Sequence, residues 1–144
     1  VIKSKFEEFD LEKKIWTLPY YNMKARREHK IPLSNEALSI IKFLRRKHNH
    51  EHVFTNLVTD KHISDGAMLY ILKSRFRDLK ITTHGFRSTF RDWAEETGLY
   101  QHNAIEFCLA HELPNKVEKA YLRSDLIEQR KIIMNDWGKY IMSE

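Results

Sequence analysis

The spacing of apolar residues after Ser34 constrains the fold of this chain most strongly. Ser34 is a typical N-cap, and the apolar residues that follow it recur at helical intervals up to about Lys47: Leu38, Ile41, Phe43 and Leu44. A second helix is expected after Asp65 as its cap, with Met68, Leu69, Leu72 and Phe76 at the same spacing. Further helices are predicted over residues 83–98, 102–110, 114–122 and 125–142.

The first third of the chain has a different pattern, which is typical of strands. Leu11, Ile15 and Trp16 lie around a charged turn and predict a short hairpin. The stretch "YYNMKARREHKIPLS" predicts a second hairpin with a very basic tip between Tyr21 and Ile31. The expected fold class is therefore α+β, with a small antiparallel sheet first and a mainly helical body after it.

Composition limits the organisation and the partners of the chain. Its 144 residues fit a single domain that spans 1–144. The formal net charge is +5 and the pI is near 9.3, which favours polyanionic partners and nucleic acid above all. The one cysteine, Cys108, lies in the apolar run "IEFCLA" and is expected to be buried. No apolar run approaches the roughly 18 residues of a membrane span, so no membrane partner is expected.

The stretch "THGFRSTFRDWAEETG", residues 83–98, combines a core face with a polar face. Thr83 is the expected N-cap, and the predicted core face consists of Phe86, Phe90, Trp93 and Ala94. His84, Arg87 and Arg91 fall together on the neighbouring face, close to the positive end of the helix. Donors of this kind at a helix N-terminus suit a phosphate, although a solvated polar edge has the same pattern.

Three further segments carry polar groups that suit the same chemistry. "CLAHELPNKVEKAYLRSD" contains His111 in a predicted turn and Tyr121 in a short basic helix, and "NMKARREHKIPL" contains Lys24 at a hairpin tip. Together with "HGFR", these motifs resemble in order and spacing the catalytic domain of tyrosine recombinases, the phage integrase family, in the form found in prophages and genomic islands. The resemblance covers almost the whole chain.

The resemblance implies a catalytic role for five residues. Tyr121 would attack a DNA phosphodiester and form a 3′-phosphotyrosine. Arg87 would bind the non-bridging oxygens, His84 would hydrogen-bond the phosphate or help to take the tyrosine proton, and His111 would donate to another phosphate oxygen. Lys24 would protonate the leaving 5′-oxygen. Cations around a phenol lower its pKa and stabilise the charge at phosphorus, so neither a metal nor another cofactor is expected.

The resemblance also has a gap. The family has a second essential arginine on a helix before the first hairpin, and no arginine of this chain lies in that motif. We therefore expect the chain to be the C-terminal catalytic domain of a longer integrase, without its N-terminal DNA-binding domain and first arginine helix. Loss of one such cation costs roughly 10² in rate, so the isolated chain is expected to be nearly inactive.

The expected partners are double-stranded DNA at attachment sites and further copies of the protein, joined on DNA through the helix 125–142. This places the protein in the cytoplasm, on the chromosome, where it would integrate or excise a mobile element. Phosphate contacts are expected from Arg26, Arg27, Lys30, Arg91 and Arg123. The stretch "KHNHEH" at 47–52 is interpreted as a polar loop, not a metal site. Two alternatives stay open: a non-catalytic DNA-binding fragment or relic of an integrase, and a basic interaction domain unrelated to DNA.

Overall fold

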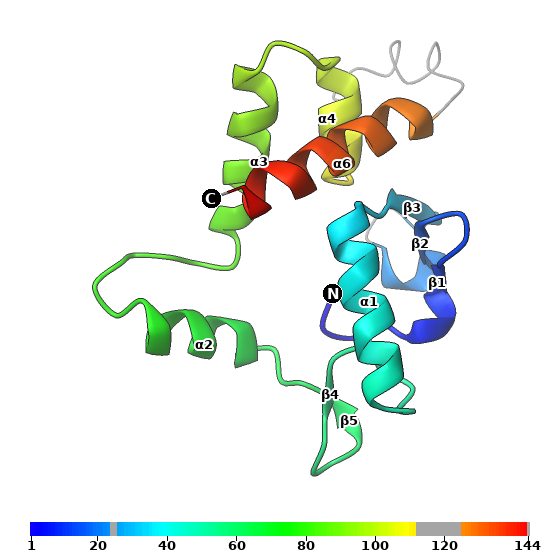
Figure 1. The fold of residues 1–144 in the computed structure, drawn as a ribbon, viewed down its shortest axis with the longest axis vertical. Coiled ribbons are helices and arrows are strands. Elements are labelled where there is room, and N and C mark those ends of the chain that lie inside the picture. The colour runs from blue at the N-terminus through cyan, green and yellow to red at the C-terminus, as the bar shows by residue number, and fades with distance from the viewer. Residues whose placement is uncertain (24–25, 112–124, 144) are drawn as a thin grey trace.

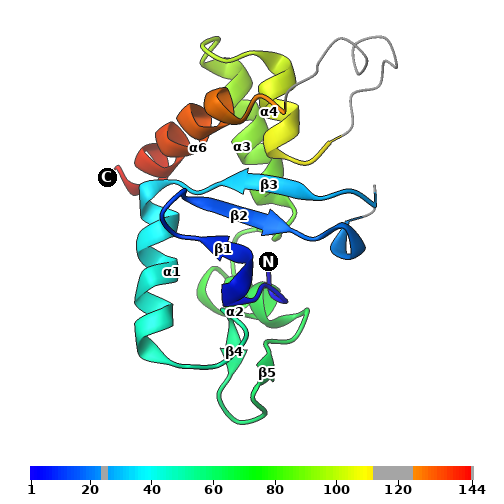
Figure 2. The same ribbon diagram turned by 90° about the vertical axis from the view of Figure 1, so that its right-hand side faces the viewer.

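The computed structural model describes residues 1–23, 26–111 and 125–143 (Figure 1). Short antiparallel strands occupy the first part of the chain, and helices make up most of the rest. The predicted α+β class is therefore confirmed. Figure 2 shows the strands between α1 on one side and the helices α3, α4 and α6 above them.

One three-stranded antiparallel sheet contains both predicted hairpins, in the order β1-β2-β3. Its strands are β1 (Phe9–Asp10), β2 (Ile15–Leu18) and β3 (His29–Pro32). Phe9 pairs with Trp16 across the first hairpin, and Leu18 pairs with His29 across the second. The second hairpin is therefore formed by β2 and β3. It was expected to begin at Tyr20 with its tip between Tyr21 and Ile31, but Tyr20–Asn22 form a 3-10 turn (η2) after Pro19, and β3 already begins at His29. A first 3-10 turn, η1 (Phe6–Glu8), precedes β1.

Helix α1 (Asn35–Lys47) begins where the sequence predicted. The Ser34 hydroxyl accepts a hydrogen bond from the Ala37 amide at 3.1 Å, which satisfies one of the free N–H groups of the first turn. Leu38 and Ile41 are buried in a cluster with Phe9, Leu33 and Val53. Phe43 was expected on the same face but is 56% exposed, because it lies two positions from Ile41 and so on another side of the helix.

Beyond Val53 and Phe54, the segment after α1 contributes little to the core. It forms a small hairpin, β4 (Thr55–Asn56) and β5 (Lys61–His62), that the sequence reading missed, followed by α2 (Ala67–Arg75). The predicted cap of α2 is wrong by one residue, because the N-cap is Gly66 and not Asp65. No residue of α2 is buried among the described residues, and Figure 1 shows α2 apart from the other helices.

Three helices build the second cluster: α3 (Gly85–Glu96), α4 (His102–Cys108) and α6 (Ile127–Met142). Their shared core consists of Phe90, Ala94, Ala104, Ile105, Leu109 and Ile133. Of the predicted apolar stripe on the last helix, Ile133 is 1% exposed but Tyr140 and Ile141 are each 54% exposed. The helix expected over 114–122 lies outside the described residues. Within the described ranges, no helix has the length and apolar character needed to cross a membrane.

Helix α6 joins the two clusters, because it contacts α3 and α4 on one side and α1 and β3 on the other. At α1, the Asn135 side chain accepts a hydrogen bond from the Asn35 amide at 3.2 Å. Gly138 lies against the cap of α1. A Cβ atom at Gly138 would come within 2.7 Å of the Ser34 hydroxyl and 2.8 Å of its Cβ, and would also meet the Glu36 carboxylate. This glycine therefore allows the two helices to approach each other.

At β3, α6 is held by a buried arginine. Arg130 is 1% exposed and donates to the Lys30 carbonyl at 2.5 Å and to the Asp125 carbonyl at 3.4 Å, and the Asp125 carboxylate is 3.9 Å away. His29 lies beside this cation, with its Nε2 3.4 Å from the guanidinium. Burial, and then the charge of Arg130, lower the pKa of His29 from 6.5 to about 4. His29 is therefore neutral when the chain is folded at neutral pH.

We expect Gly138→Ala to destabilise the chain. Alanine favours an ordinary helix interior by up to about 1 kcal/mol, but here the new methyl group meets the backbone-bound Ser34, which cannot move without disturbing the cap. A net loss of about 1–3 kcal/mol is expected in thermal or urea unfolding. Gly66→Ala is the matched control, because a Cβ there meets nothing within 4 Å. An equal effect of the two changes would contradict the close approach of α1 and α6.

We expect His29 to make stability depend on pH. Its folded pKa lies below its unfolded value, so as pH falls from 6.5 toward 4 the unfolded chain binds a proton that the folded chain does not. The free energy of unfolding, measured by urea titration at each pH, should decrease through this window. His29→Gln should flatten the slope above pH 4.5. This is the ordinary pKa of a glutamate, and below it carboxylates with a lowered pKa, such as Glu106, also contribute. An unchanged slope in the variant would assign the effect to other groups.

Candidate active site

The first turn of α3 presents two of the predicted site residues. His84 is the N-cap of the helix and Arg87 lies one turn later, so both are on the same side, and both are exposed. The cap differs from the prediction in that Thr82, and not Thr83, accepts the hydrogen bond from the Gly85 amide, at 3.0 Å. Phe86, expected in the core, is 54% exposed, whereas Phe90 and Ala94 are buried as predicted.

The chain turns sharply after α4 and brings His111 back toward α3. Ala110 adopts a left-handed backbone conformation with φ 55°, which ends the helix. The His111 amide then donates to the Glu106 carbonyl at 3.0 Å, so that the residue after the turn is tied to the helix it leaves. This local turn determines the position of the His111 ring.

Arg87 and His111 are in direct contact across the gap between α3 and α4. One guanidinium nitrogen, Nη2, donates to the Leu109 carbonyl at 2.6 Å and lies 3.1 Å from Nε2 of His111. The first bond fixes the arginine by the backbone of the turn, and the second joins it to the imidazole. Two residues that are 24 positions apart in the sequence therefore share one surface site with exposed nitrogen atoms.

Glu106 on α4 binds both His111 and Arg91. Its Oε2 accepts from Nδ1 of His111 at 2.8 Å, and its Oε1 accepts from Nε of Arg91 at 2.6 Å. Burial alone would raise the pKa of Glu106, but the hydrogen bonds from His111 and Arg91 outweigh it and hold the pKa below its ordinary value. We call Arg87, His111, Glu106 and Arg91 the α3–α4 network. The sequence reading missed Glu106, although it lies on α4 only five positions before His111.

The other predicted residues lie on the second hairpin, on α3 or outside the described residues. Lys24, Tyr121 and Arg123 lie outside the described residues. Arg26 and Arg27 are exposed in the connection between β2 and β3, and Lys30 is exposed on β3 with its ammonium 3.6 Å from Glu28. Among the described residues expected to contact phosphates, Arg91 is the one that belongs to the α3–α4 network, through its ion pair with Glu106.

The tyrosines that the structure describes differ clearly in environment. Tyr100 donates to Asp136 at 3.0 Å, and burial together with this bond raises its pKa to about 12, the opposite of what a nucleophile needs. Tyr140 stacks on Trp137 and lies against Trp93. Tyr20, Tyr21 and Tyr70 are exposed on η2 and α2.

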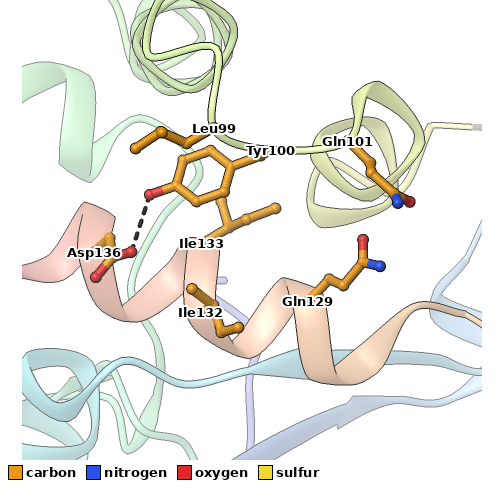
Figure 3. A pocket seen from close by; sticks show the side chains of 7 residues that line it. All are labelled: Leu99, Tyr100, Gln101, Gln129, Ile132, Ile133 and Asp136. Carbon is orange, nitrogen blue, oxygen red and sulfur yellow. Dashed lines mark hydrogen bonds between the residues drawn. The ribbon is translucent and has the colours of Figure 1, made fainter.

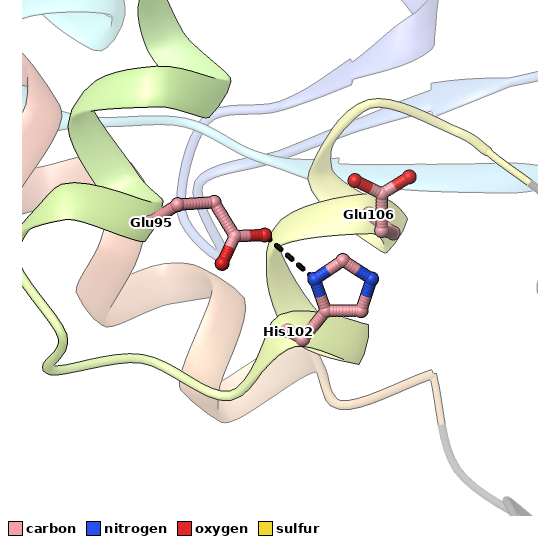
Figure 4. A group of neighbouring side chains, drawn as sticks. All are labelled: Glu95, His102 and Glu106. Atoms are coloured by element: carbon pink, nitrogen blue, oxygen red, sulfur yellow. Dashed lines mark hydrogen bonds and ion pairs between the residues drawn. The ribbon is translucent and has the colours of Figure 1, made fainter.

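A possible metal-ligand group shares Glu106 with the α3–α4 network and also contains Glu95 and His102 (Figure 4). It is the one such group among the described residues. Its ligand atoms are already engaged in ion pairs: Nδ1 of His102 lies 2.6 Å from Glu95, and both oxygens of Glu106 accept hydrogen bonds from the network. Since Glu95 and His102 are also exposed, ion pairing accounts for the arrangement.

A hollow of about 440 Å³ lies at the other end of the helices. It is lined by Leu99, Tyr100 and Gln101 between α3 and α4 and by Gln129, Ile132, Ile133 and Asp136 of α6 (Figure 3). The α3–α4 network, in contrast, is at the start of α3 and the end of α4. The hollow is therefore separate from the candidate active site.

Comparison with known proteins identifies the family to which the chain is similar. Residues 1–126 match the phage integrase family. The prophage integrase IntZ of Escherichia coli (strain K12) is 34% identical over 96% of this chain, and the integrase of Enterobacteria phage P4 is 28% identical over the same share. The chain spans 35% of the length of each of these relatives. No solved structure matches it significantly.

The family match covers most of the chain, and it includes every residue of the α3–α4 network together with Lys24 and Tyr121. The order of motifs, the α+β architecture and the sequence match agree. The chain belongs to the phage integrase family.

Proposed function

We propose that this chain provides the catalytic site of a site-specific DNA recombinase that cuts and rejoins DNA through a tyrosine. The observation that carries the proposal is the direct contact of Arg87 with His111 in a member of the phage integrase family. The two side chains approach from separate helices and present cationic or hydrogen-bonding nitrogens to solvent at one point. A phosphodiester is the DNA group that such a pair fits best.

The proposed reaction begins with attack on phosphorus by the Tyr121 oxygen, and His84 takes the proton that this oxygen gives up. The new bond joins this oxygen to the 3′-phosphate, the bond from phosphorus to the 5′-oxygen breaks, and Lys24 gives that oxygen a proton. Arg87, His84 and His111 bind the non-bridging oxygens, where negative charge increases in the transition state. Rejoining is the reverse reaction with a 5′-hydroxyl from another strand, and it needs no ATP because the phosphotyrosine retains the bond energy.

The partners follow from the same proposal. Double-stranded DNA would lie over the α3–α4 network, with Arg26, Arg27, Lys30 and Arg123 on its backbone phosphates. Strand exchange needs several copies on DNA, in the cytoplasm and on the chromosome. The described contacts of α6 are made within its own chain, and Ile141 and Met142 near its end are exposed, so a neighbouring copy could cover them.

We expect Tyr121→Phe to abolish the covalent protein–DNA adduct in a full-length integrase that contains this chain. The change removes the attacking oxygen and leaves the ring. The adduct is measured on DNA that carries the attachment site, as a band that resists denaturant. Tyr100→Phe and Tyr70→Phe are matched controls and should retain the adduct. An adduct in the Tyr121 variant, or none in the unmodified protein that still binds DNA, would contradict the catalytic proposal and favour a non-catalytic DNA-binding module.

The isolated chain should bind DNA in a salt-dependent way but form the adduct at least roughly 10² more slowly than a full-length integrase, because no second catalytic arginine is recognised in it. Replacing Arg26, Arg27 and Lys30 by alanine should weaken binding and reduce its salt dependence. A control with the same loss of charge is Lys42, Arg46 and Lys47 to alanine on α1. Equal effects of the two triple variants would contradict a specific role of the hairpin.

A further inference from the structure

Glu106 is the member of the α3–α4 network to which no role has yet been given. Its side chain is 13% exposed, whereas the side chains of its partners His111 and Arg91 are 43% and 48% exposed. Each of its two oxygens has one partner, at 2.8 and 2.6 Å. A carboxylate that is mostly covered and fully paired at a proposed phosphate site is unusual, because its negative charge opposes the binding of an anion.

The contacts of His111 determine which ring nitrogen carries the proton. Arginine has only donors, so Nε2 of His111 must accept from Arg87. The carboxylate of Glu106 is an acceptor, since its pKa is held low, and Nδ1 must therefore donate to it. Both partners require the same neutral tautomer, with the hydrogen on Nδ1 and a free electron pair on Nε2.

This tautomer has a consequence for the proposed reaction. For His111 to donate to a phosphate oxygen through Nε2, the ring must gain a proton and become an imidazolium. A carboxylate hydrogen-bonded to the opposite nitrogen stabilises that cation and keeps the ring in place. The phosphate would also displace the Arg87 nitrogen from Nε2, so that both side chains point to the same anion.

We propose that Glu106 is a positioning residue for the strand-transfer reaction: it orients His111, fixes the hydrogen on Nδ1 and stabilises the imidazolium that donates Nε2–H to the scissile phosphate. The proposal rests on the function proposed above. Glu106 does not touch the phosphate, because its oxygens are occupied by His111 and Arg91. Arg91 has a supporting part, since it neutralises the second oxygen and so reduces the repulsion between Glu106 and the substrate.

A simple surface ion pair between Arg91 and Glu106 would account for only half of these contacts. Such a pair would not explain the second contact, in which Oε2 of Glu106 accepts a hydrogen bond from Nδ1 of His111. This contact directs the other ring nitrogen, Nε2, toward Arg87. The neighbouring pair Glu95–His102 shows what a surface pair looks like: its side chains are 40% and 59% exposed, and among the described residues no arginine is hydrogen-bonded to the other nitrogen of His102. Glu95 therefore provides a matched control.

The first test measures the tautomer in the 144-residue chain. Long-range proton–nitrogen NMR spectra of ¹⁵N-histidine in alkaline buffer should assign the hydrogen of His111 to Nδ1. In Glu106→Ala the population should shift toward the Nε2–H form, and in Glu95→Gln it should stay unchanged. A ring with its hydrogen on Nε2 in the unmodified chain, or an unchanged ring in Glu106→Ala, would overturn the proposal.

The second test measures cleavage under single-turnover conditions in a full-length integrase that contains this chain. Glu106→Gln should lower the rate of adduct formation by at least about tenfold with unchanged DNA affinity and thermal stability, because it retains shape and removes charge. Glu106→Asp should restore part of the rate, and Glu95→Gln should not change it. Unchanged cleavage in Glu106→Gln would overturn this inference alone. Failure of the unmodified protein to form any adduct would instead overturn the proposed function and leave the tautomer result intact.

Discussion

The buried guanidinium of Arg130 is the interaction on which the arrangement of the chain depends. A buried cation needs hydrogen-bond partners, and the two terminal nitrogens of Arg130 find them in the Asp125 and Lys30 carbonyls, whereas its Nε has no partner among the described residues. These bonds tie α6 to β3 and, through the sheet, to the basic hairpin. Helix α6 also packs on α3 and α4. The same helix therefore sets the orientation of the α3–α4 network relative to Arg26 and Arg27, which lie between β2 and β3. His29 remains neutral first because it is partly buried and then because a second positive charge beside Arg130 would be repelled.

The α3–α4 network shows how a short turn produces a site from residues on separate helices. Ala110 ends α4 in a left-handed conformation, and the Leu109 carbonyl that becomes available accepts a hydrogen bond from Arg87. The next side chain, His111, then lies against the same arginine. The arginine and the histidine are therefore held by backbone geometry and by Glu106, and do not depend on DNA to come together. A preformed arrangement of this kind reduces the reorganisation needed when the substrate binds.

Much of this architecture could be predicted from local patterns, and the errors have physical reasons. Ser34 as a cap and Leu38 and Ile41 as core residues follow from side-chain chemistry and helical spacing, and both predictions are confirmed. Phe86 and Phe43 fit apolar patterns but are exposed, because burial depends on which neighbours cover a helix face. The contact of Arg87 with His111 agrees with the motif order, whereas Glu106 was missed because a lone glutamate on a short helix has no distinctive pattern. The roles of Lys24 and Tyr121 stay predictions.

The α3–α4 network has a charge balance that suits its proposed ligand. In the state described here, Arg87 and Arg91 supply two positive charges, Glu106 supplies one negative charge, and the hydrogen bonds of His111 require a neutral ring. The sum is one positive charge, which matches the single negative charge of a phosphodiester. Attack at phosphorus adds a second negative charge to the transient five-coordinate species, and a proton on His111 would add a second positive charge at the same place. His111 would thus become positively charged only when the reaction creates the second negative charge, and its interaction with phosphate would be strongest in the transition state.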